Sequence, residues 1–582
     1  MDMSDRNDGS RNIRPILAAL VVSLSLALAA CGGGSSGSVA STPAPTPSPS
    51  PTPVNASLAE LTQSQSFTND SSGLSANFDL STRTTIDGKL NADTLTIRYD
   101  ATTKGYTVTS GSRSQTFTSA NVTRRESDLV EYRNTAGSGQ ILSLFTETGT
   151  AAKRKYVGMG FWQSNSEVSS RQSSDFSAFA YGLPTNATAV PRTGSAAYAI
   201  DIFGAVIAPG IEPKSFSGSG KFSLDFAQGQ FSALASAYEY GLGTGSETSG
   251  GGIELRAGGL LSSSDGTFTG NAFYGSTLGN SAGTISGRLF GPQGQEIGAT
   301  FQTSNAAGMA AIGSLAGARD TSSLAENLTL TALRSEQRFL TFGGGGIGSI
   351  TLIGPDTFDF VGYSSDMVGG RFTANEKVAS SNPNFTAYEK TGDNGYGPQK
   401  VRIELFKPGT ANTEIALTYA SFGKWTGSGS NTVGTHYFTY GFQTANGLLA
   451  ARTGRARYEG IAYGSGLNSN ASASYDIKGT TSFDVDFSTQ KFGGTLALTG
   501  VERTSGTRAD FGAYALGGDL FLQQSYLLGN ITRAGSSVGN VWGEFYGPNG
   551  QELGGSFYLN APAGSGEARE VGIKGAFVTV GK

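Results

Sequence analysis

Residues Leu289–Phe301 read LFGPQGQEIGATF, and 256 positions later residues Phe545–Phe557 read FYGPNGQELGGSF. Both stretches place a proline between glycines, first as Gly291-Pro292-Gln293-Gly294 and then as Gly547-Pro548-Asn549-Gly550. Proline fixes φ near −65°, and glycine accepts the positive φ that a tight turn needs. So many helix-breaking residues exclude a helix. We therefore expect each stretch to form a strand, a turn and a second strand, and the near copy indicates a duplicated unit.

The duplication extends well beyond this hairpin. Three further pairs of segments match at separations of 259 to 261 residues: Phe179–Gly182 with Phe438–Gly441, Arg192–Tyr198 with Arg452–Tyr458, and Phe222–Phe226 with Phe483–Phe487. The nearly constant separation predicts two homologous halves, near residues 58–320 and 325–582, which differ by small loop insertions.

Composition and patterning predict an all-β protein. The 582 residues include 85 Gly, 34 Phe and 22 Tyr, and only 15% are charged. Glycine disfavours helices, and aromatic residues suit a half-buried pleated surface. Beyond Arg192 and Arg452, short strand patterns such as Gln230–Ala235 and Thr284–Phe290 recur between Gly, Ser and Asn. This spacing predicts an antiparallel barrel of about eight strands in each half. The preceding parts are less regular β-domains.

The inventory of chemically active residues is small. Net charge is −4, so no overall field attracts nucleic acid. The chain has one Cys and one His, which excludes internal disulfides and metal sites built from thiolates or several His. We expect no cofactor, no metal, no nucleic-acid partner and no enzymatic activity.

The amino terminus has the features of an export signal. Arg11 and Arg14 precede an apolar run, Ile16–Ala30, that stops at Cys31. The run is too short to cross a membrane as a stable helix. Leu28-Ala29-Ala30-Cys31 resembles the bacterial lipobox, which implies cleavage before Cys31 and lipidation of its sulfur and new amine. We expect residues 1–30 to be a lipoprotein signal peptide; the alternative is a stray Cys at the end of an ordinary signal.

A tether follows the lipidation site. Residues 31–57 are rich in Gly and Ser and then in alternating Pro, which gives a disordered, partly extended chain. Gly32 stands where lipoproteins kept at the inner membrane often carry Asp, so the lipobox resemblance implies transit to the outer membrane. Several acyl chains anchor a protein firmly, because each buried CH₂ contributes about 0.8 kcal/mol.

Taken together, the lipobox, the tether and two copies of a β-domain followed by a barrel resemble the transferrin-binding protein B family of surface lipoproteins. The motif that carries the resemblance is G-x-[FL]-[FY]-G-P-x-G-x-E-x-G-[GA]-x-F, at Gly287–Phe301 and Gly543–Phe557. The resemblance implies an all-β fold of two homologous lobes, each a handle β-domain followed by an approximately eight-stranded antiparallel β-barrel. The expected handles are residues 58–190 and 325–449, and the expected barrels are residues 191–320 and 450–582.

The resemblance also implies a function. The expectation is a lipid-anchored outer-membrane protein at the cell surface that binds an iron- or haem-carrying protein, or a small solute, other than transferrin itself. It would pass this cargo to a TonB-dependent receptor, and its other partner is the lipid bilayer, through acylated Cys31. No motif identifies ligand-binding residues. The hairpin residues are expected to be structural, with both glutamates capping or bridging backbone groups beside the turn: Gly291, Pro292, Gly294, Glu296, Gly298, Gly547, Pro548, Gly550, Glu552 and Gly554.

Nucleotide-binding and nucleophile motifs are present but lack their context. Gly343–Gly348 matches G-x-G-x-x-G, as does Gly32–Gly37, but neither leads from a strand into a helix. Gly279–Gly283 matches the G-x-S-x-G elbow, yet a triad would need His436 from the other half. His436 could ligate haem or iron; a packed or solvated His is expected.

Two groups of side chains could have a functional role in place of a structural one. Asp484 and Asp486 alternate and so project from one strand face, and Asp225 repeats the second of them. They could hold Ca²⁺ or act as acid and base, although outward-facing polar residues are expected. Tyr238 and Tyr240 could bind haem or a partner surface, but barrel packing is expected.

Three rival functions remain to be weighed. An adhesin or structural envelope lipoprotein would have the same anchor and fold without cargo. A glycan-active envelope enzyme would use Asp484 and Asp486. A transmembrane porin is disfavoured, because the lipobox supplies the anchor and Val580-Gly581-Lys582 lacks a terminal aromatic.

Overall fold

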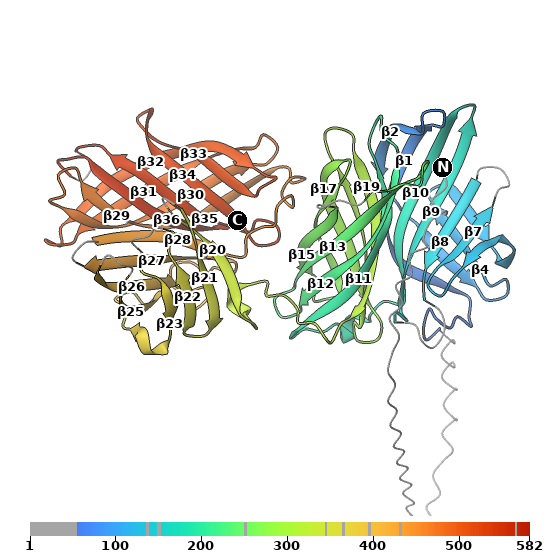
Figure 1. Cartoon of the computed structure of the whole chain (residues 1–582), viewed down its shortest axis with the longest axis horizontal. Coiled ribbons are helices and arrows are strands. Elements are labelled where there is room, and N and C mark those ends of the chain that lie inside the picture. The colour runs from blue at the N-terminus through green and yellow to red at the C-terminus, as the bar shows by residue number, and fades with distance from the viewer. Residues whose placement is uncertain are drawn as a thin grey trace, which may run out of the picture.

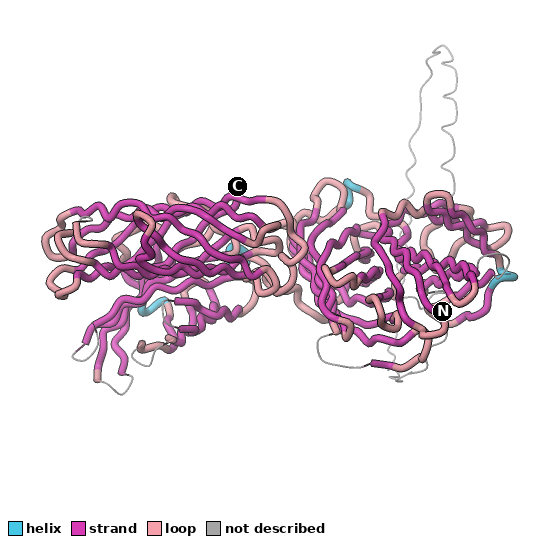
Figure 2. The backbone as a smooth tube through the Cα atoms, turned by 90° about the horizontal axis from the view of Figure 1, so that it is seen from above, coloured by secondary structure: helices cyan, strands magenta, loops and turns pink. Residues whose placement is uncertain are grey.

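The computed structural model describes residues 55–134, 139–147, 153–248, 253–343, 346–363, 367–393, 397–429, 433–564 and 567–582. The signal peptide, Cys31 and the tether up to residue 54 lie outside the described residues. Strands dominate the rest (Figure 2), and neighbouring strands run antiparallel. Short 3-10 helices occur at Ser119–Asn121, Ala187–Ala189, Leu330–Ala332 and Ala374–Glu376. In the described part of the chain, no helix is long and apolar enough to span a membrane.

The N-lobe handle is a ten-stranded sheet in the order β5-β4-β3-β1-β10-β9-β8-β7-β6, with β2 beside β1. Its own core contains Trp162, Phe179 and Tyr181. The strands are β1 (Gln65–Asp79), β2 (Thr84–Asn91), β3 (Thr96–Asp100), β4 (Gly105–Ser110), β5 (Arg113–Phe117), β6 (Val122–Arg125), β7 (Val130–Asn134), β8 (Gly139–Phe145), β9 (Val157–Val168) and β10 (Arg171–Gly182).

The N-lobe barrel closes through the β11–β19 and β12–β13 pairs, and the short β14 extends the edge of β13. Along β13, Phe231 and Ala233 point into the core while Ser232 and Leu234 point outward, as the period of two requires. The strands are β11 (Ser195–Ile207), β12 (Lys214–Asp225), β13 (Gln230–Gly241), β14 (Glu247–Thr248), β15 (Glu254–Leu261), β16 (Thr267–Ser276), β17 (Gly279–Phe290), β18 (Glu296–Ser304) and β19 (Ala310–Arg319).

The C-lobe handle is a nine-stranded sheet in the order β23-β22-β21-β20-β28-β27-β26-β25-β24. Trp425, Phe438 and Tyr440 lie in its core. The strands are β20 (Gln337–Gly343), β21 (Gly346–Gly354), β22 (Thr357–Val361), β23 (Gly370–Phe372), β24 (Lys377–Val378), β25 (Phe385–Asp393), β26 (Pro398–Phe406), β27 (Ala420–Gly429) and β28 (Val433–Gly441).

The C-lobe barrel is a closed ring of the eight strands β29 to β36, filled by a core that includes Phe483, Phe545 and Phe577. The strands are β29 (Arg455–Asn468), β30 (Ser474–Asp486), β31 (Lys491–Glu502), β32 (Arg508–Phe521), β33 (Tyr526–Arg533), β34 (Ser536–Tyr546), β35 (Glu552–Ala561) and β36 (Val571–Gly581).

The two lobes lie end to end (Figure 1). The N-lobe handle, in blue, is at one end, and the N-lobe barrel, in green, lies between it and the C-lobe. In each lobe a separate apolar cluster joins the handle to the barrel. The all-β, two-lobed architecture with eight-stranded barrels confirms the fold predicted from sequence. Each handle is more regular than the sequence predicted. Its strands form one continuous sheet, and the polar segments are the connections between these strands.

Candidate functional site

The duplicated turns lie where each handle meets its barrel. One turn joins β17 to β18, and its copy joins β34 to β35. φ is +83° at Gly291 and +69° at Gly294, and the copy has +85° at Gly547 and +66° at Gly550. Side chains with a Cβ rarely adopt this region, so these glycines permit the turn.

The segment that leads from handle to barrel holds the turn in place. The Thr185 hydroxyl donates to the carbonyl oxygen of Gly291 at 2.7 Å, and the Tyr198 hydroxyl donates to that of Gly294 at 2.7 Å. Both bonds recur in the C-lobe, from Thr444 to Gly547 at 2.5 Å and from Tyr458 to Gly550 at 2.6 Å. Because the same hydroxyl bonds hold the turn carbonyls in both lobes, each turn is a fixed joint between its handle and its barrel.

Glu296, which follows the turn, binds three consecutive backbone N–H groups of the handle. Its carboxylate accepts from Lys155 at 2.6 Å, Tyr156 at 2.7 Å and Val157 at 2.9 Å, where β9 begins. Burial raises the pKa of Glu296, and the three N–H bonds act against that rise. The main-chain N–H groups and the positive charge of Arg154 both favour the ionised form of Glu296.

Glu552 repeats the arrangement at the start of β27. It accepts from the backbone N–H groups of Thr418 at 2.6 Å, Tyr419 at 3.0 Å and Ala420 at 2.7 Å. Burial raises the pKa of Glu552 to about 7 against the opposing effect of these bonds. The sequence suggested backbone groups beside the turn. The structure places the bonded groups 132 to 141 residues earlier, in the handle. We call the two arrangements the glutamate clamps.

The glycine two residues after each clamp glutamate differs between the lobes. A Cβ built at Gly298 would lie 2.7 Å from Cγ2 of Val157, so only glycine lets the handle approach this closely. At Gly554 the nearest atom would be Cε2 of Tyr546, at 3.3 Å. The N-lobe joint is therefore the tighter one at this point.

An ion pair crosses the N-lobe joint, and the matching positions of the described C-lobe residues do not form one. The Arg288 guanidinium donates twice to the Asp70 carboxylate, from Nε and Nη2, both at 2.8 Å. Such bidentate pairs are strong and directional. Arg288 stands three residues before its turn, and Glu544 holds that position in the copy.

The position that matches Asp70 is Phe342. Asp70 pairs with Ala180 in the sheet, and Phe342 pairs with Thr439, the matching residue of the copy. The ring of Phe342 packs edge-on against Trp542, with centroids 5.2 Å apart. Both differences are present in the sequence, but only the pairing of distant strands shows that the two positions correspond, so no sequence motif reveals them.

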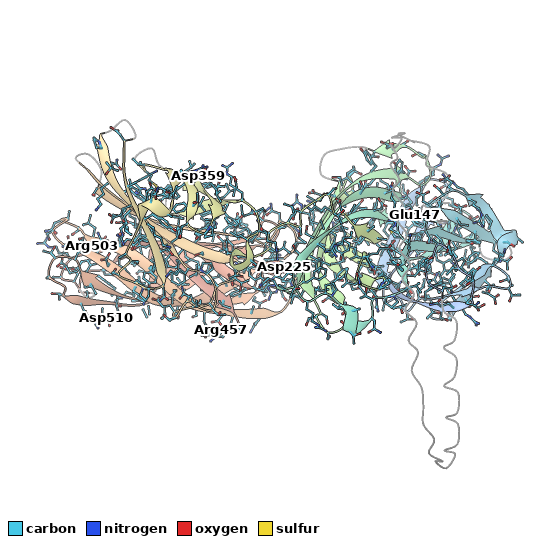
Figure 3. The ribbon with its side chains drawn as sticks, turned by 90° about the horizontal axis from the view of Figure 1, so that it is seen from below. Glu147, Asp225, Asp359, Arg457, Arg503 and Asp510 are labelled. Carbon is cyan, nitrogen blue, oxygen red and sulfur yellow. The ribbon has the colours of Figure 1, made fainter. Side chains whose placement is uncertain are left out.

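The paired aspartates both lie on β30 of the C-lobe barrel. Asp484 and Asp486 lie on the outer surface, ion-paired with Arg457 at 2.9 Å and Arg455 at 3.0 Å. Figure 3 shows Arg457 on the C-lobe barrel and Asp225 at the junction between the lobes. Asp225 matches Asp486 in the repeat, yet it is buried and bonded to another lobe.

The remaining candidates also take structural positions. His436 Nδ1 lies 2.9 Å from the Tyr363 hydroxyl, and its ring packs against Trp425. Gly343 and Gly346 belong to the successive strands β20 and β21, and Gly279–Gly283 lies inside β17, so neither motif leads into a helix. Tyr238 is exposed on the barrel, and Tyr240 is half-buried. Within the described ranges, no three His, Cys, Asp or Glu side chains gather as a metal site.

The fold and its joints define a class of protein: two lobes, each a handle sheet clamped onto a closed barrel. Residues 451–579 match the family model for the C-lobe and N-lobe beta barrels of Tf-binding protein B. A 171-residue stretch is 34% identical to transferrin-binding protein B of Neisseria meningitidis serogroup B, and the match covers 27% of this chain and 27% of that protein.

Solved structures of the same kind of protein also match. An isotype 1 transferrin-binding protein B from serogroup B Neisseria meningitidis is 19% identical, with 74% of this chain and 85% of that chain covered and a TM-score of 0.26. A Haemophilus parasuis transferrin-binding protein B variant is 14% identical, with 88% and 95% covered and a TM-score of 0.26. Residues 451–579 are similar in sequence to the barrels of transferrin-binding protein B, and the 171-residue match is to the same kind of protein.

Proposed function

We propose that the protein is an outer-membrane lipoprotein that binds an iron- or haem-related protein or small solute and passes it to a membrane receptor. The observation that carries this proposal is the 34% identity to a protein named for binding transferrin. The matched stretch spans about a quarter of that relative, so the cargo is a proposal for this chain. The binding role is favoured over catalysis, because Asp484 and Asp486, the carboxylates of the glycan-active alternative, are held in ion pairs with Arg457 and Arg455.

The joints explain how such a protein would present a binding surface. Clamps, turns and apolar clusters fix each handle to its barrel, which leaves the loops at the strand ends free to contact a partner. Loops on a rigid scaffold commonly carry binding residues, and aromatic anchors ringed by polar groups dominate affinity. We assign the cargo contacts to the loops of the handles and barrel rims.

Anchoring rests on Cys31, with residues 1–30 as the signal peptide and 31–57 as the tether. Cells that express the full chain should incorporate labelled palmitate into it, and Cys31→Ser should abolish the label and release the protein from membranes. Protease treatment of intact cells should degrade the protein if it occupies the outer surface. Complete protection in intact cells, with degradation after lysis, would place it on the inner leaflet instead.

Cargo binding can be tested with the purified full chain. Lactoferrin, haemoglobin and free haem are the probes, and at least one of them should bind the purified chain. The chain itself should copurify with a TonB-dependent receptor. A deletion strain should then grow poorly only under iron limitation. If no probe binds and deletion has no effect under iron starvation, the cargo proposal fails. Loss of surface attachment without a nutrient defect would point to an adhesin.

A further inference from the structure

One surface near the joint is polar in the N-lobe and apolar in the C-lobe. The matched turns and the strand pairings align the positions of the two copies. The aligned pairs are Thr68 and Leu340, Asp70 and Phe342, Thr109 and Val361, Thr269 and Leu528, and Ser286 and Trp542. Because the two copies share their fold, the apolar residues are not needed to build the joint itself.

The apolar side chains of the C-lobe lie next to one another. Phe342 is the cross-strand neighbour of Ile347 in the handle, and its ring contacts Trp542 of the barrel. Leu528 is in turn the cross-strand neighbour of Trp542. We call this surface the C-lobe strip and define it as Leu340, Phe342, Ile347, Val361, Leu528 and Trp542. Leu340 is 49% exposed and Val361 is 59% exposed. Apolar residues exposed singly are ordinary, but a contiguous group of them marks an interaction surface.

One end of the C-lobe strip carries a cation. Arg338 precedes Leu340 by two positions, so both side chains lie on the same face of β20. Arg338 is exposed and makes no ion pair with a described residue, only a long bond from Nη2 to Oγ of Ser349 at 3.5 Å. The acid in the same row of the sheet, Asp359, is already bound twice by Arg371, at 2.8 Å each time. Arg338 can therefore pair with an acid from outside the chain.

The other end of the C-lobe strip carries a carboxylate without a cation. Glu544 follows Trp542 by two positions on the outer face of β34 and stands where the N-lobe has Arg288. Glu544 is 8% exposed and bonds to no described residue, and neither of its oxygens is fully enclosed. A guanidinium from outside can reach this carboxylate beside the Trp542 ring, whose face attracts cations.

A cation at one end and an anion at the other make the C-lobe strip complementary to itself. In a two-fold symmetric dimer both copies use the same surface, and each contact between two different residues occurs twice. A two-fold axis near Leu340 reverses the strip and brings Arg338 of each copy to Glu544 of the other. We propose that the protein forms a two-fold symmetric dimer through the C-lobe strip, closed by two Arg338–Glu544 ion pairs.

This dimer is independent of the cargo proposal and is expected to be weak. Small interfaces are usually transient, and we expect a dissociation constant of about 10–100 µM. Unfolding measurements at about 1 µM protein therefore report the monomer. Sedimentation equilibrium of the purified full chain, from about 1 to 300 µM, should show a monomer–dimer equilibrium. Measurement at pH 8 keeps Glu544 ionised, because burial raises its pKa to about 7.

A substitution in the middle of the C-lobe strip tests the apolar contact. Leu340→Asp buries a charge in the dimer and should weaken association at least about tenfold. The matched control is Leu467→Asp, because Leu467 is 50% exposed on β29 of the same lobe and lies outside the strip. The control should associate like the parent. All variants carry the same anchor, so association through acyl chains cancels in the comparison.

Two charge reversals test the ion pairs. Arg338→Glu copies carry an acid at both ends of the strip, and Glu544→Lys copies carry a base at both ends. Each variant alone should be monomeric up to about 300 µM, because every pair is then repulsive. An equimolar mixture should form heterodimers, since both pairs become attractive. Loss of folding in one variant cannot be repaired in this way. If Glu544→Lys does not fold, Glu544→Gln should weaken association at least about fivefold without lowering the stability of the fold.

Four results would overturn the dimer. The first is a parent chain that stays monomeric at about 300 µM, and the second is assembly beyond the dimer, which a closed two-fold interface does not allow. The third is the same affinity for Leu340→Asp and Leu467→Asp. The fourth is the absence of heterodimers in a mixture of the two folded charge variants, or unchanged association of Glu544→Gln where it replaces Glu544→Lys.

Discussion

Arg288 and Glu544 occupy the same position in two copies of one hairpin, and they carry opposite charges into the same kind of joint. Arg288 pairs with Asp70 across the N-lobe joint. Glu544 is buried beside a handle strand that carries Phe342 in place of that aspartate, and no cation among the described residues pairs with it. Burial raises the pKa of Glu544 to about 7.

The first prediction concerns pH. The folded-state pKa of Glu544 lies above its ordinary value of 4.5, so the unfolded state loses this proton first as pH rises. The free energy of unfolding should fall as pH rises from about 4.5 to about 7 and stay low above that. Glu544→Gln should raise it by up to about 3 kcal/mol at pH 8 and leave it unchanged at pH 4.5.

Denaturant unfolding at both pH values measures this effect. Glu552 shifts in the same direction, so part of the pH dependence should persist in the variant. The exposed Glu570, changed to Gln, is the matched control and should leave the profile unchanged. Equal stabilisation by Glu544→Gln at both pH values would show that ionisation of Glu544 has no part in it.

The second prediction transplants the N-lobe ion pair. Glu544→Arg alone leaves a buried guanidinium unpaired, and Phe342→Asp alone loses the contact with Trp542 and adds a second carboxylate. The double variant can form the pair that Asp70 and Arg288 make. A double-mutant cycle should give a favourable coupling of about 1–3 kcal/mol. Additive effects in thermal or denaturant unfolding would mean that the two joints are not geometrically equivalent.

The third prediction concerns the glutamate clamps. Glu296→Gln turns an acceptor of three N–H bonds into an amide whose NH₂ faces donors, and should cost about 2–3 kcal/mol. Hydrogen exchange at residues 155–157 should accelerate most, because those amides lose their acceptor. The exposed Glu247→Gln is the control within the same lobe. Unchanged exchange at 155–157 would show that the bonds contribute nothing to the joint.

The fourth prediction concerns the ion pair between Arg334, at the start of the C-lobe, and Asp225 of the N-lobe barrel. Arg334→Ala leaves the Asp225 carboxylate buried without its cation, which costs up to about 3–5 kcal/mol for a fully buried pair. The effect should be smaller here, because the Arg334 side chain is 31% exposed. X-ray scattering should show a larger radius of gyration, and proteolysis near residues 320–326 should accelerate.

Arg455→Ala provides the matched control for that experiment. Arg455 is 85% exposed and pairs with Asp486, the repeat partner of Asp225. Exposed pairs contribute about 0–1 kcal/mol, so this variant should keep the scattering profile and stability of the parent. A parent-like profile for Arg334→Ala as well would mean that other contacts fix the lobe arrangement, such as the close approach of Gly447 to Phe273 and of Gly258 to Pro548.

The sequence predicted what depends on local chemistry. The turn glycines, the duplication and the eight-stranded barrels follow from backbone preferences and period-two patterns. The clamps could not be predicted, because each glutamate binds backbone groups more than 130 residues away. Asp225 and Asp486 look equivalent in the repeat and differ only because a second lobe covers one of them. The domain limits and the lipidation of Cys31 stay predictions.

The clamps also bear on how this architecture can diverge. Glu296 and Glu552 bind main-chain N–H groups, and main-chain groups are the same whatever side chain they carry. One clamp holds Lys155-Tyr156-Val157 and the other holds Thr418-Tyr419-Ala420, with the same three bonds. The clamp bonds therefore do not depend on the side chains at the handle positions that they hold. The surface residues of a handle can therefore change, or one handle domain can replace another, while the barrel keeps the same glutamate that binds the handle backbone.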